Sequence, residues 1–231
     1  MSDVLSKIVN IFPLSVYIDD VAEHASLKKN LTAKVKALPA PRPDTPFAWT
    51  GDVNGHGFIH LDEDFKPWLD AMLPHIHRYL ELLRMRTEYL DIYFQRSWPV
   101  VTKRSQEIPS HNHENAHISL VYYLNKPERA GGLRLMVRNA PNEIVPNTFS
   151  AGDAVQPFFF ERTVFNSNRV DMELNEGQVV IFPSKTLHQT IQSEADDERI
   201  SLVADIVVML KADSECEKFM PAFSLWKKLT D

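Results

Sequence analysis

The run 116-AHISLVYYLN-125 is one of five short stretches, rich in β-branched and aromatic residues, that dominate the chain after about residue 88. The others are 89-YLDIYFQRSW-98, 131-GGLRLMV-137, 177-GQVVIFP-183 and 199-RISLVADIVVML-210. Prolines, glycines, asparagines and acidic clusters separate them. Short strands with turn signals between them are typical of an all-β sandwich or barrel. We therefore predict a jelly-roll barrel as the core of the fold, over residues 88–210.

Helical spacing characterises the part of the chain before this core. Apolar residues recur at helical intervals at Leu27, Leu31, Val35 and Leu38. A second helix is predicted to begin near Asp62 or Asp64. The predicted organisation is a single domain over residues 1–231. It has a helical N-terminal layer over 1–87 and a helical tail over 211–231.

The overall composition is that of a soluble globular protein, with 44% hydrophobic and 24% charged residues. The formal net charge is −6 and no dense Lys/Arg block occurs, so neither nucleic acid nor an anionic membrane is expected as the main partner. The single cysteine, Cys216, cannot form an intramolecular disulfide, which favours a reducing compartment. With no signal-peptide pattern and no long apolar run, we expect a cytoplasmic protein.

Two histidines two residues apart, His111 and His113, give the strongest chemical signal, within 109-PSHNHENAHISLVYYLN-125. In an extended chain, side chains at positions i and i+2 project from the same face, so both imidazoles could chelate one metal ion. The natural third ligand is His188, in a separate segment. Imidazole suits iron, zinc, copper and nickel, so the sequence predicts a transition-metal site.

A basic residue on the last predicted strand gives a second signal. Arg199 and Ser201 are two positions apart in 198-ERISLVADIVV-208 and would share one strand face. A guanidinium there can pair bidentately with a carboxylate, and the hydroxyl can add a hydrogen bond. The partner is either a small dicarboxylate ligand or, in an ordinary salt bridge, Glu198 or Asp205.

The order of these motifs resembles the 2-oxoglutarate/Fe(II) dioxygenase superfamily. It consists of a His-x-His pair, then YYLN, GG-L, G-x-V-x-F-P, a further histidine and Arg-x-Ser. The stretch HISLVYYLNKPERAGGLRL is similar to the prolyl hydroxylase branch. More closely, the protein resembles an oxygenase family with an HxH motif, an S-x-V-Y-Y-L strand and an F-P-S-x-x-x-H element. This resemblance implies a double-stranded β-helix and hydroxylation of an aliphatic carbon, with Fe(II) as metal and 2-oxoglutarate as co-substrate.

The resemblance also implies roles for individual residues. His111 and His188 correspond to iron ligands, and His113 occupies the position where most of the superfamily has Asp or Glu. The distal carboxylate of 2-oxoglutarate would be held by Arg199 and Tyr123, with Ser201 assisting. The alternation along ISLVYYL could instead make Tyr123 a core residue.

The sequence departs from the usual superfamily pattern in two respects. No carboxylate stands two residues after His111 or His113, and the interval from His113 to Tyr123 is shorter than in prolyl hydroxylases. Either three imidazoles bind the iron, or Glu114, His117, water or another acid completes the ligand set. A cupin-type three-His iron dioxygenase that does not use 2-oxoglutarate is an alternative, and a non-catalytic metal- or ligand-binding barrel is another. Arg199 and Ser201 favour the 2-oxoglutarate interpretation.

The substrate is predicted only by class: a small metabolite, an amino acid or a protein side chain. The segment 139–170 is rich in turn formers and aromatics, and it either covers the substrate entrance or packs with Phe158–Phe160 in the core. Gln95 and Trp98 either face the same cavity or fill the barrel.

Overall fold

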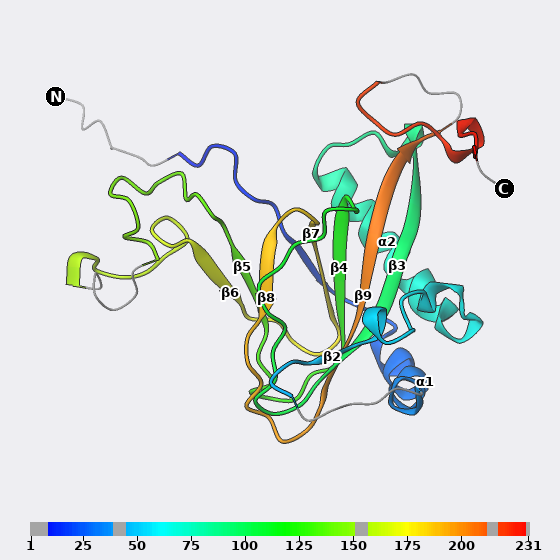
Figure 1. Ribbon diagram of the computed structural model, residues 1–231, viewed down its shortest axis with the longest axis horizontal. Coiled ribbons are helices and arrows are strands. Elements are labelled where there is room, and N and C mark those ends of the chain that lie inside the picture. Colours follow the sequence, from blue (N-terminus) through cyan, green and yellow to red (C-terminus); the bar gives the residue numbers. More distant parts are fainter. Residues whose placement is uncertain (1–8, 39–44, 151–156, 212–216, 230–231) are drawn as a thin grey trace.

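The computed structural model describes residues 9–38, 45–150, 157–211 and 217–229, and shows a mainly β protein with antiparallel sheets (Figure 1). Cys216 lies outside these ranges. Within them, no helix combines the length and apolarity that crossing a membrane would require.

A six-stranded sheet and a three-stranded sheet carry the fold. The large sheet has the order β1-β7-β4-β9-β3-β2, formed by Tyr17–Asp20, Gln178–Pro183, Ile118–Asn125, Arg199–Leu210, Leu90–Thr102 and Trp49–Thr50 respectively. The small sheet has the order β6-β5-β8, formed by Arg169–Met172, Leu133–Met136 and Leu187–Thr190. All neighbouring strands in both sheets pair antiparallel. The five runs predicted as strands correspond to β3, β4, β5, β7 and β9, so that prediction is confirmed.

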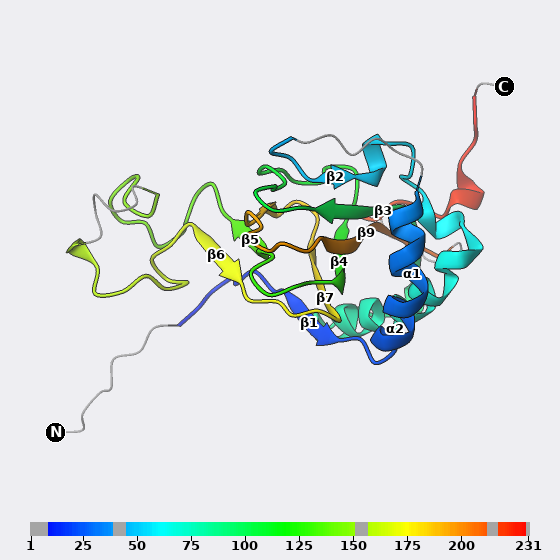
Figure 2. The same ribbon diagram turned by 90° about the horizontal axis from the view of Figure 1, so that it is seen from below.

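Two α-helices, α1 (His24–Ala37) and α2 (Lys66–Leu82), lie on one side of the large sheet (Figure 2). In α1 the side chains of Leu27, Leu31 and Val35 are buried, as their spacing predicts. Asp62 accepts a hydrogen bond from the backbone N–H of Asp64 and caps a short 3-10 helix that leads into α2. Short 3-10 helices of the described residues include Gly51–Val53, Ile59–Leu61, Glu63–Phe65, Thr87–Tyr89 and Phe223–Leu225.

The structure corrects the predicted ends of the protein. The predicted helical layer over residues 1–87 also supplies β1, which pairs with β7, and β2, which pairs with β3. β1 is short and polar, and β2 has only two residues, so neither shows the alternation of a strand in the sequence. In the described part of 211–231, the helical structure of the predicted tail is limited to the 3-10 helix Phe223–Leu225.

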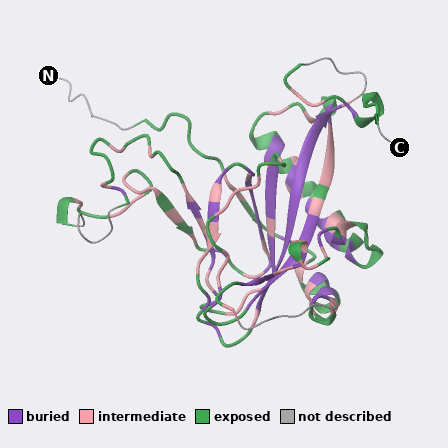
Figure 3. Ribbon diagram, viewed as in Figure 1, coloured by how far each residue is buried: buried purple, intermediate pink, exposed green. Residues whose placement is uncertain are grey.

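Alternation along the central strands gives the large sheet two different faces. One face packs against the helices through apolar side chains such as Leu120, Leu202 and Ile206, all buried. Each such side chain stabilises the fold by about 1.5–3 kcal/mol when fully buried. The other face meets the small sheet, where Tyr123 and Phe182 pack with residues of β5. All of β9 is buried, because both of its faces are covered (Figure 3).

Candidate metal centre

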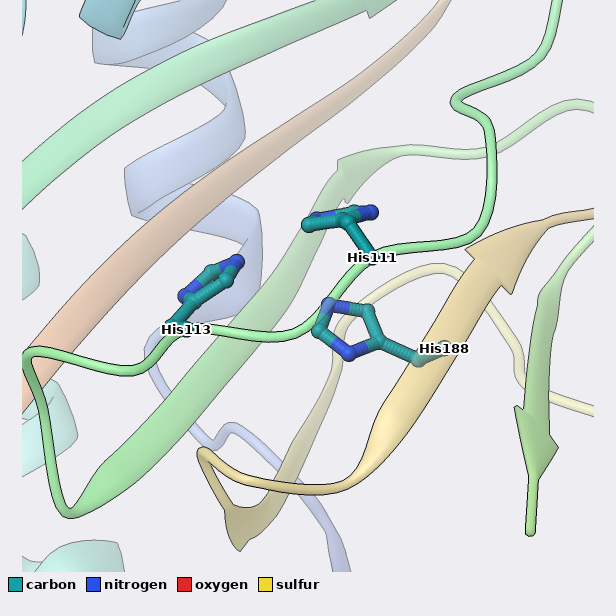
Figure 4. Close-up of side chains that lie close together, drawn as sticks. All are labelled: His111, His113 and His188. Carbon is teal, nitrogen blue, oxygen red and sulfur yellow. The ribbon is translucent and has the colours of Figure 1, made fainter. Parts of the chain in front are cut away.

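Two neighbouring extended segments bring the predicted histidines together. His111 and His188 form an antiparallel β-bridge, with N···O distances of 2.9 and 2.8 Å between their backbones. The backbone N–H of His113 donates to the carbonyl of Ser184 at 3.0 Å. His188 therefore lies on β8, while His111 and His113 lie on an extended loop before β4 (Figure 4).

The three imidazoles converge on one point in space (Figure 4). Their ring centroids are 4.3 Å apart for His111 and His188, and 5.1 Å apart for each pair that includes His113. One nitrogen from each ring lies within 4.8 Å of the others. This spacing and donor type fit a first-row transition metal such as iron.

Hydrogen bonds fix which nitrogen of each ring is free. The Nδ1 atoms of His111 and His188 each lie 2.8 Å from a backbone carbonyl, of Pro109 and Thr186 respectively. A carbonyl can only accept, so these Nδ1 atoms carry the protons and donate. The Nδ1 of His113 faces a carboxylate oxygen of Asp205. All three Nε2 lone pairs are thus available to a metal, which is the arrangement typical of metal-binding histidines.

Burial keeps two of these rings neutral. It lowers the pKa of His111 and lowers the pKa of His188 to about 3, and repulsion from the other histidines acts in the same direction. Metal binding requires neutral imidazole. The rings are therefore ready to coordinate near neutral pH without first losing a proton.

Asp205 is the residue at this site whose role the sequence does not reveal. The sequence suggests it only as a salt-bridge partner of Arg199, yet its side chain is buried against the ring of His113. Asp205 belongs to β9 and His113 to a distant loop, so no local motif connects them. The one available sign is its place on the strand face of Arg199 and Ser201, which precede it by six and four positions along β9.

The alternative ligands that the sequence allows lie apart from the cluster. The Nδ1 of His117 accepts a hydrogen bond from the backbone N–H of Val208 at 3.1 Å. Glu114 is exposed on the wall of a cavity beside the histidines. Within the described residues, the potential metal-binding group consists of His111, His113 and His188 only.

Arg199, Ser201 and Tyr123 lie together beside the histidines. They line an inner cavity of about 50 Å³ between the two sheets, which His111, His113 and His188 also line. Arg199 and Ser201 share one strand face, as their spacing predicts. Tyr123 is buried and faces this cavity, so the core and cavity interpretations of its position both hold.

Arg199 is buried without a counter-ion in the part of the protein that the structure describes. It is 2% exposed, and its guanidinium donates to the carbonyl of Ala130 at 2.8 Å and to the hydroxyl of Thr102 at 3.1 Å. The salt bridge to Glu198 or Asp205 that the sequence allows is absent among these residues. Burial lowers the pKa of the guanidinium, because the interior disfavours its charge. A buried cation in this situation calls for an anionic ligand.

An outer cavity of about 410 Å³ also borders His111 and His113. Gln95 and Trp98 both line it, as one of the two sequence interpretations predicts. No described residue of 139–170 lines either cavity, and this segment extends away from the large sheet (Figure 1). Phe158 is 82% exposed and Phe160 is fully exposed, so the alternative that packs Phe158–Phe160 in the core is wrong.

Comparisons with known proteins agree with this geometry. Residues 96–205 match the family model described as "Putative 2OG-Fe(II) oxygenase". A search of curated protein sequences found no match.

Several solved structures have a similar fold. One is the non-heme alpha ketoglutarate dependent epimerase SnoN from nogalamycin biosynthesis, with 12% identity over 86% of this protein and 81% of that one, and a TM-score of 0.57. Another is a Pseudomonas putida prolyl-4-hydroxylase, with 15% identity, coverage of 83% and 92%, and a TM-score of 0.50. HygX from Streptomyces hygroscopicus, solved with nickel, 2-oxoglutarate and hygromycin B bound, has 10% identity, coverage of 90% and 91%, and a TM-score of 0.51.

Proposed function

Because residues 96–205 match the 2OG-Fe(II) oxygenase family model, we propose that the protein is a member of the 2-oxoglutarate/Fe(II) oxygenase superfamily. It is an Fe(II)- and 2-oxoglutarate-dependent dioxygenase that hydroxylates an aliphatic carbon of a small molecule. One observation carries this proposal: three imidazoles with free Nε2 atoms converge beside a buried guanidinium that has no counter-ion among the described residues.

In this proposal His111, His113 and His188 hold the iron. Three neutral imidazoles leave the full charge of Fe(II) uncompensated, whereas the usual two-His-one-carboxylate set removes one unit. The 2-oxoglutarate dianion would balance that charge. Asp205 adds a negative charge behind His113 without touching the metal, through its hydrogen bond to Nδ1.

Arg199 would bind the distal carboxylate of 2-oxoglutarate, assisted by Ser201 and Tyr123. All three line the inner cavity together with the histidines, which supports this assignment. The iron and 2-oxoglutarate supply the activation of dioxygen, while the protein positions them and keeps water away. Leu133, Val121 and Val203 belong to the apolar part of the inner wall and would serve that exclusion.

The finer architecture is part of the same proposal. The two antiparallel sheets with a cavity between them support a double-stranded β-helix over 88–210, within a single domain over 1–231. Residues 1–87 add a layer with α1 and α2. The single cysteine supports a reducing location, the cytoplasm.

A three-His iron dioxygenase of the cupin type is the second candidate, since the described metal-binding group contains no carboxylate. Such an enzyme would have no use for an unpaired arginine beside the metal. The two candidates therefore differ in whether the protein binds 2-oxoglutarate.

An anaerobic titration tests the proposal. Fe(II) and then 2-oxoglutarate are added to the protein without oxygen, and the visible metal-to-ligand charge-transfer band is recorded. We expect the band, followed by slow release of succinate when air enters. A protein that binds Fe(II) but never develops the band would be the cupin type, and one that binds neither would be a non-catalytic barrel.

Substitution of Arg199 tests its proposed role, and substitution of an exposed arginine provides the matched control. Arg199→Ala should weaken 2-oxoglutarate binding by about 30-fold or more, because a buried charge pair is worth about 2–5 kcal/mol, and it should leave iron binding nearly unchanged. Arg129→Ala removes an exposed arginine that pairs with Glu194 and should change neither affinity. Equal loss of iron and 2-oxoglutarate binding in Arg199→Ala would assign Arg199 to structure instead.

A further inference from the structure

The outer cavity carries two side chains of opposite charge on one wall. Asp52 belongs to the 3-10 helix Gly51–Val53 and Arg96 to β3. The Nη2 of Arg96 lies 3.7 Å from the Oδ2 of Asp52, which is too far for a hydrogen bond. The cavity also borders His111 and His113, so a molecule bound there would lie next to the proposed metal.

A β-bulge aims Arg96 into this cavity. The register between β3 and β9 shifts between Phe94 and Arg96, which makes Gln95 the extra residue. Consecutive side chains of a regular strand point to opposite faces, yet Gln95 and Arg96 both line the outer cavity. Bulges of this kind redirect side chains next to active sites.

Of the two residues at the bulge, Arg96 is the one whose side-chain N–H groups remain free to bind a ligand. The amide of Gln95 donates to the carbonyl of Asn115 at 2.9 Å. The guanidinium of Arg96 forms no hydrogen bond with any described residue, and it lies 5.5 Å from the ring centre of Trp98. A carboxylate entering the cavity could therefore bind to it bidentately.

The carboxylate of Asp52 has one oxygen without a partner. Its Oδ1 atom is buried, and no described residue donates a hydrogen bond to it. A buried acceptor left in this state destabilises the protein, and more so when it is charged. The Asp52 side chain is 21% exposed and lines the cavity, so a ligand there would approach the carboxylate through Oδ2, the oxygen that faces Arg96, and not through the buried Oδ1.

Building on the proposed function, we propose that the outer cavity binds a free α-amino acid as the primary substrate. Its ammonium group would donate to Asp52, and its carboxylate would accept from Arg96. Both groups are attached to one carbon atom, so they can replace the long Asp52–Arg96 contact with two short ones. The remainder of the amino acid would then lie along Trp98 and Ile108, the apolar part of this cavity's wall.

The reaction on this substrate balances with the proposed co-substrates. An aliphatic C–H bond of the amino acid becomes C–OH, and the added oxygen atom comes from dioxygen. The other oxygen atom enters succinate as 2-oxoglutarate loses carbon dioxide. Two electrons come from each of the two organic molecules, which together reduce one dioxygen. A residue within a peptide has neither head group free, so it would leave both Asp52 and Arg96 without partners.

Calorimetry on the protein loaded with nickel(II) and 2-oxoglutarate tests this inference without turnover. Each of the twenty standard L-amino acids is titrated. The tightest binder is then compared with its amine, with its carboxylic acid and with its N-acetyl amide, which mimics a peptide. We expect at least one amino acid to bind and all three derivatives to bind at least about 30-fold more weakly, since each strips or blocks a charged head group. Absence of binding by all twenty, or equal binding of any derivative, would overturn the inference.

Two substitutions test whether the charged groups of the amino acid bind in the outer cavity. Asp52→Asn and Arg96→Gln should each weaken amino-acid binding by about tenfold or more, because each removes one charged partner. The matched controls, Asp70→Asn and Arg78→Gln, alter exposed charges on α2 and should leave the affinity unchanged. Unchanged affinity in both cavity variants would refute the assignment of these residues.

The anaerobic charge-transfer band separates failure of this inference from failure of the proposed function. It is recorded first, in the wild type and in each variant. A normal band without amino-acid binding overturns only the substrate class. A missing band in the wild type overturns the proposed function, and the inference with it. A normal band in Asp52→Asn and Arg96→Gln shows that both variants are folded around an intact metal site.

Discussion

Asp205 accepts a hydrogen bond from the Nδ1 of His113, and its carboxylate is buried beside that ring. Groups in this position set the orientation and basicity of a metal-binding imidazole. The effect does not depend on direct contact with the metal. Asp205 is therefore a positioning residue, and its contribution can be measured through metal affinity alone.

We expect Asp205→Asn to lower the affinity for Fe(II) or Zn(II) by about 10- to 100-fold, as loss of such a partner does in other metal sites. Competition with a chromophoric chelator measures this. Glu114→Gln is the control, because it removes a negative charge from the same cavity without touching a ring. The same loss in both variants would mean that general charge, and not the contact with His113, holds the metal.

Among the elements, the turn that leads into β5 connects the small sheet to Arg199, the proposed co-substrate anchor. Gly131 has a φ of +71°, and a Cβ there would lie 2.2 Å from the carbonyl oxygen of Ile191. The preceding carbonyl, of Ala130, accepts a hydrogen bond from Arg199. The tight approach of this turn to the segment after β8 therefore also places one partner of the guanidinium.

Gly131→Ala should destabilise the protein strongly. The left-handed backbone costs about 1–2 kcal/mol for a residue with a Cβ, and forced packing against a backbone carbonyl adds about 1–3 kcal/mol. Gly55→Ala shares the positive φ, at +84°, but has open space around it, so only the first cost applies. Urea unfolding of the two variants measures the difference, and equal destabilisation would show that the close approach at Gly131 is not rigid.

The elements also show what the sequence can and cannot predict. Long strands such as β4 and β9 are visible because both sheet faces demand apolar or β-branched residues along their whole length. β1 reads YIDD and is exposed along most of its length, so its pairing with β7 leaves no hydrophobic pattern. The His-x-His pair is local and therefore predictable. The contact between His113 and Asp205 and the bulge at Gln95 arise from pairing between distant segments, which no local pattern encodes.

In the whole molecule, the histidine cluster lies where the two sheets meet. His188 belongs to β8 of the small sheet, whereas His113 is hydrogen-bonded to Asp205 on β9 of the large sheet. A metal ion bound to both would join the sheets directly. Metal binding should then stabilise the entire fold and not only the loop before β4.

Thermal unfolding with and without Zn(II) tests this expectation. At a free metal concentration about 100 times Kd, the free energy of unfolding should rise by about 2.7 kcal/mol. His188→Ala should abolish the gain. His117→Ala should keep it, because that ring lies apart from the cluster and contacts the backbone of Val208. A gain that survives in His188→Ala would place the stabilising metal elsewhere.

The burial of β9 along its whole length has a consequence for how the site can be lost. Arg199, Ser201 and Asp205 are separated by even numbers of positions on this one strand, so a single hydrogen-bond ladder with β3 and β4 sets the direction of all three. Sliding that ladder by one residue would turn every one of them toward the helices in a single event. The proposed co-substrate anchor and the partner of His113 therefore depend on the same strand register, and a substitution in β3 or β4 that shifts this register should disable both together.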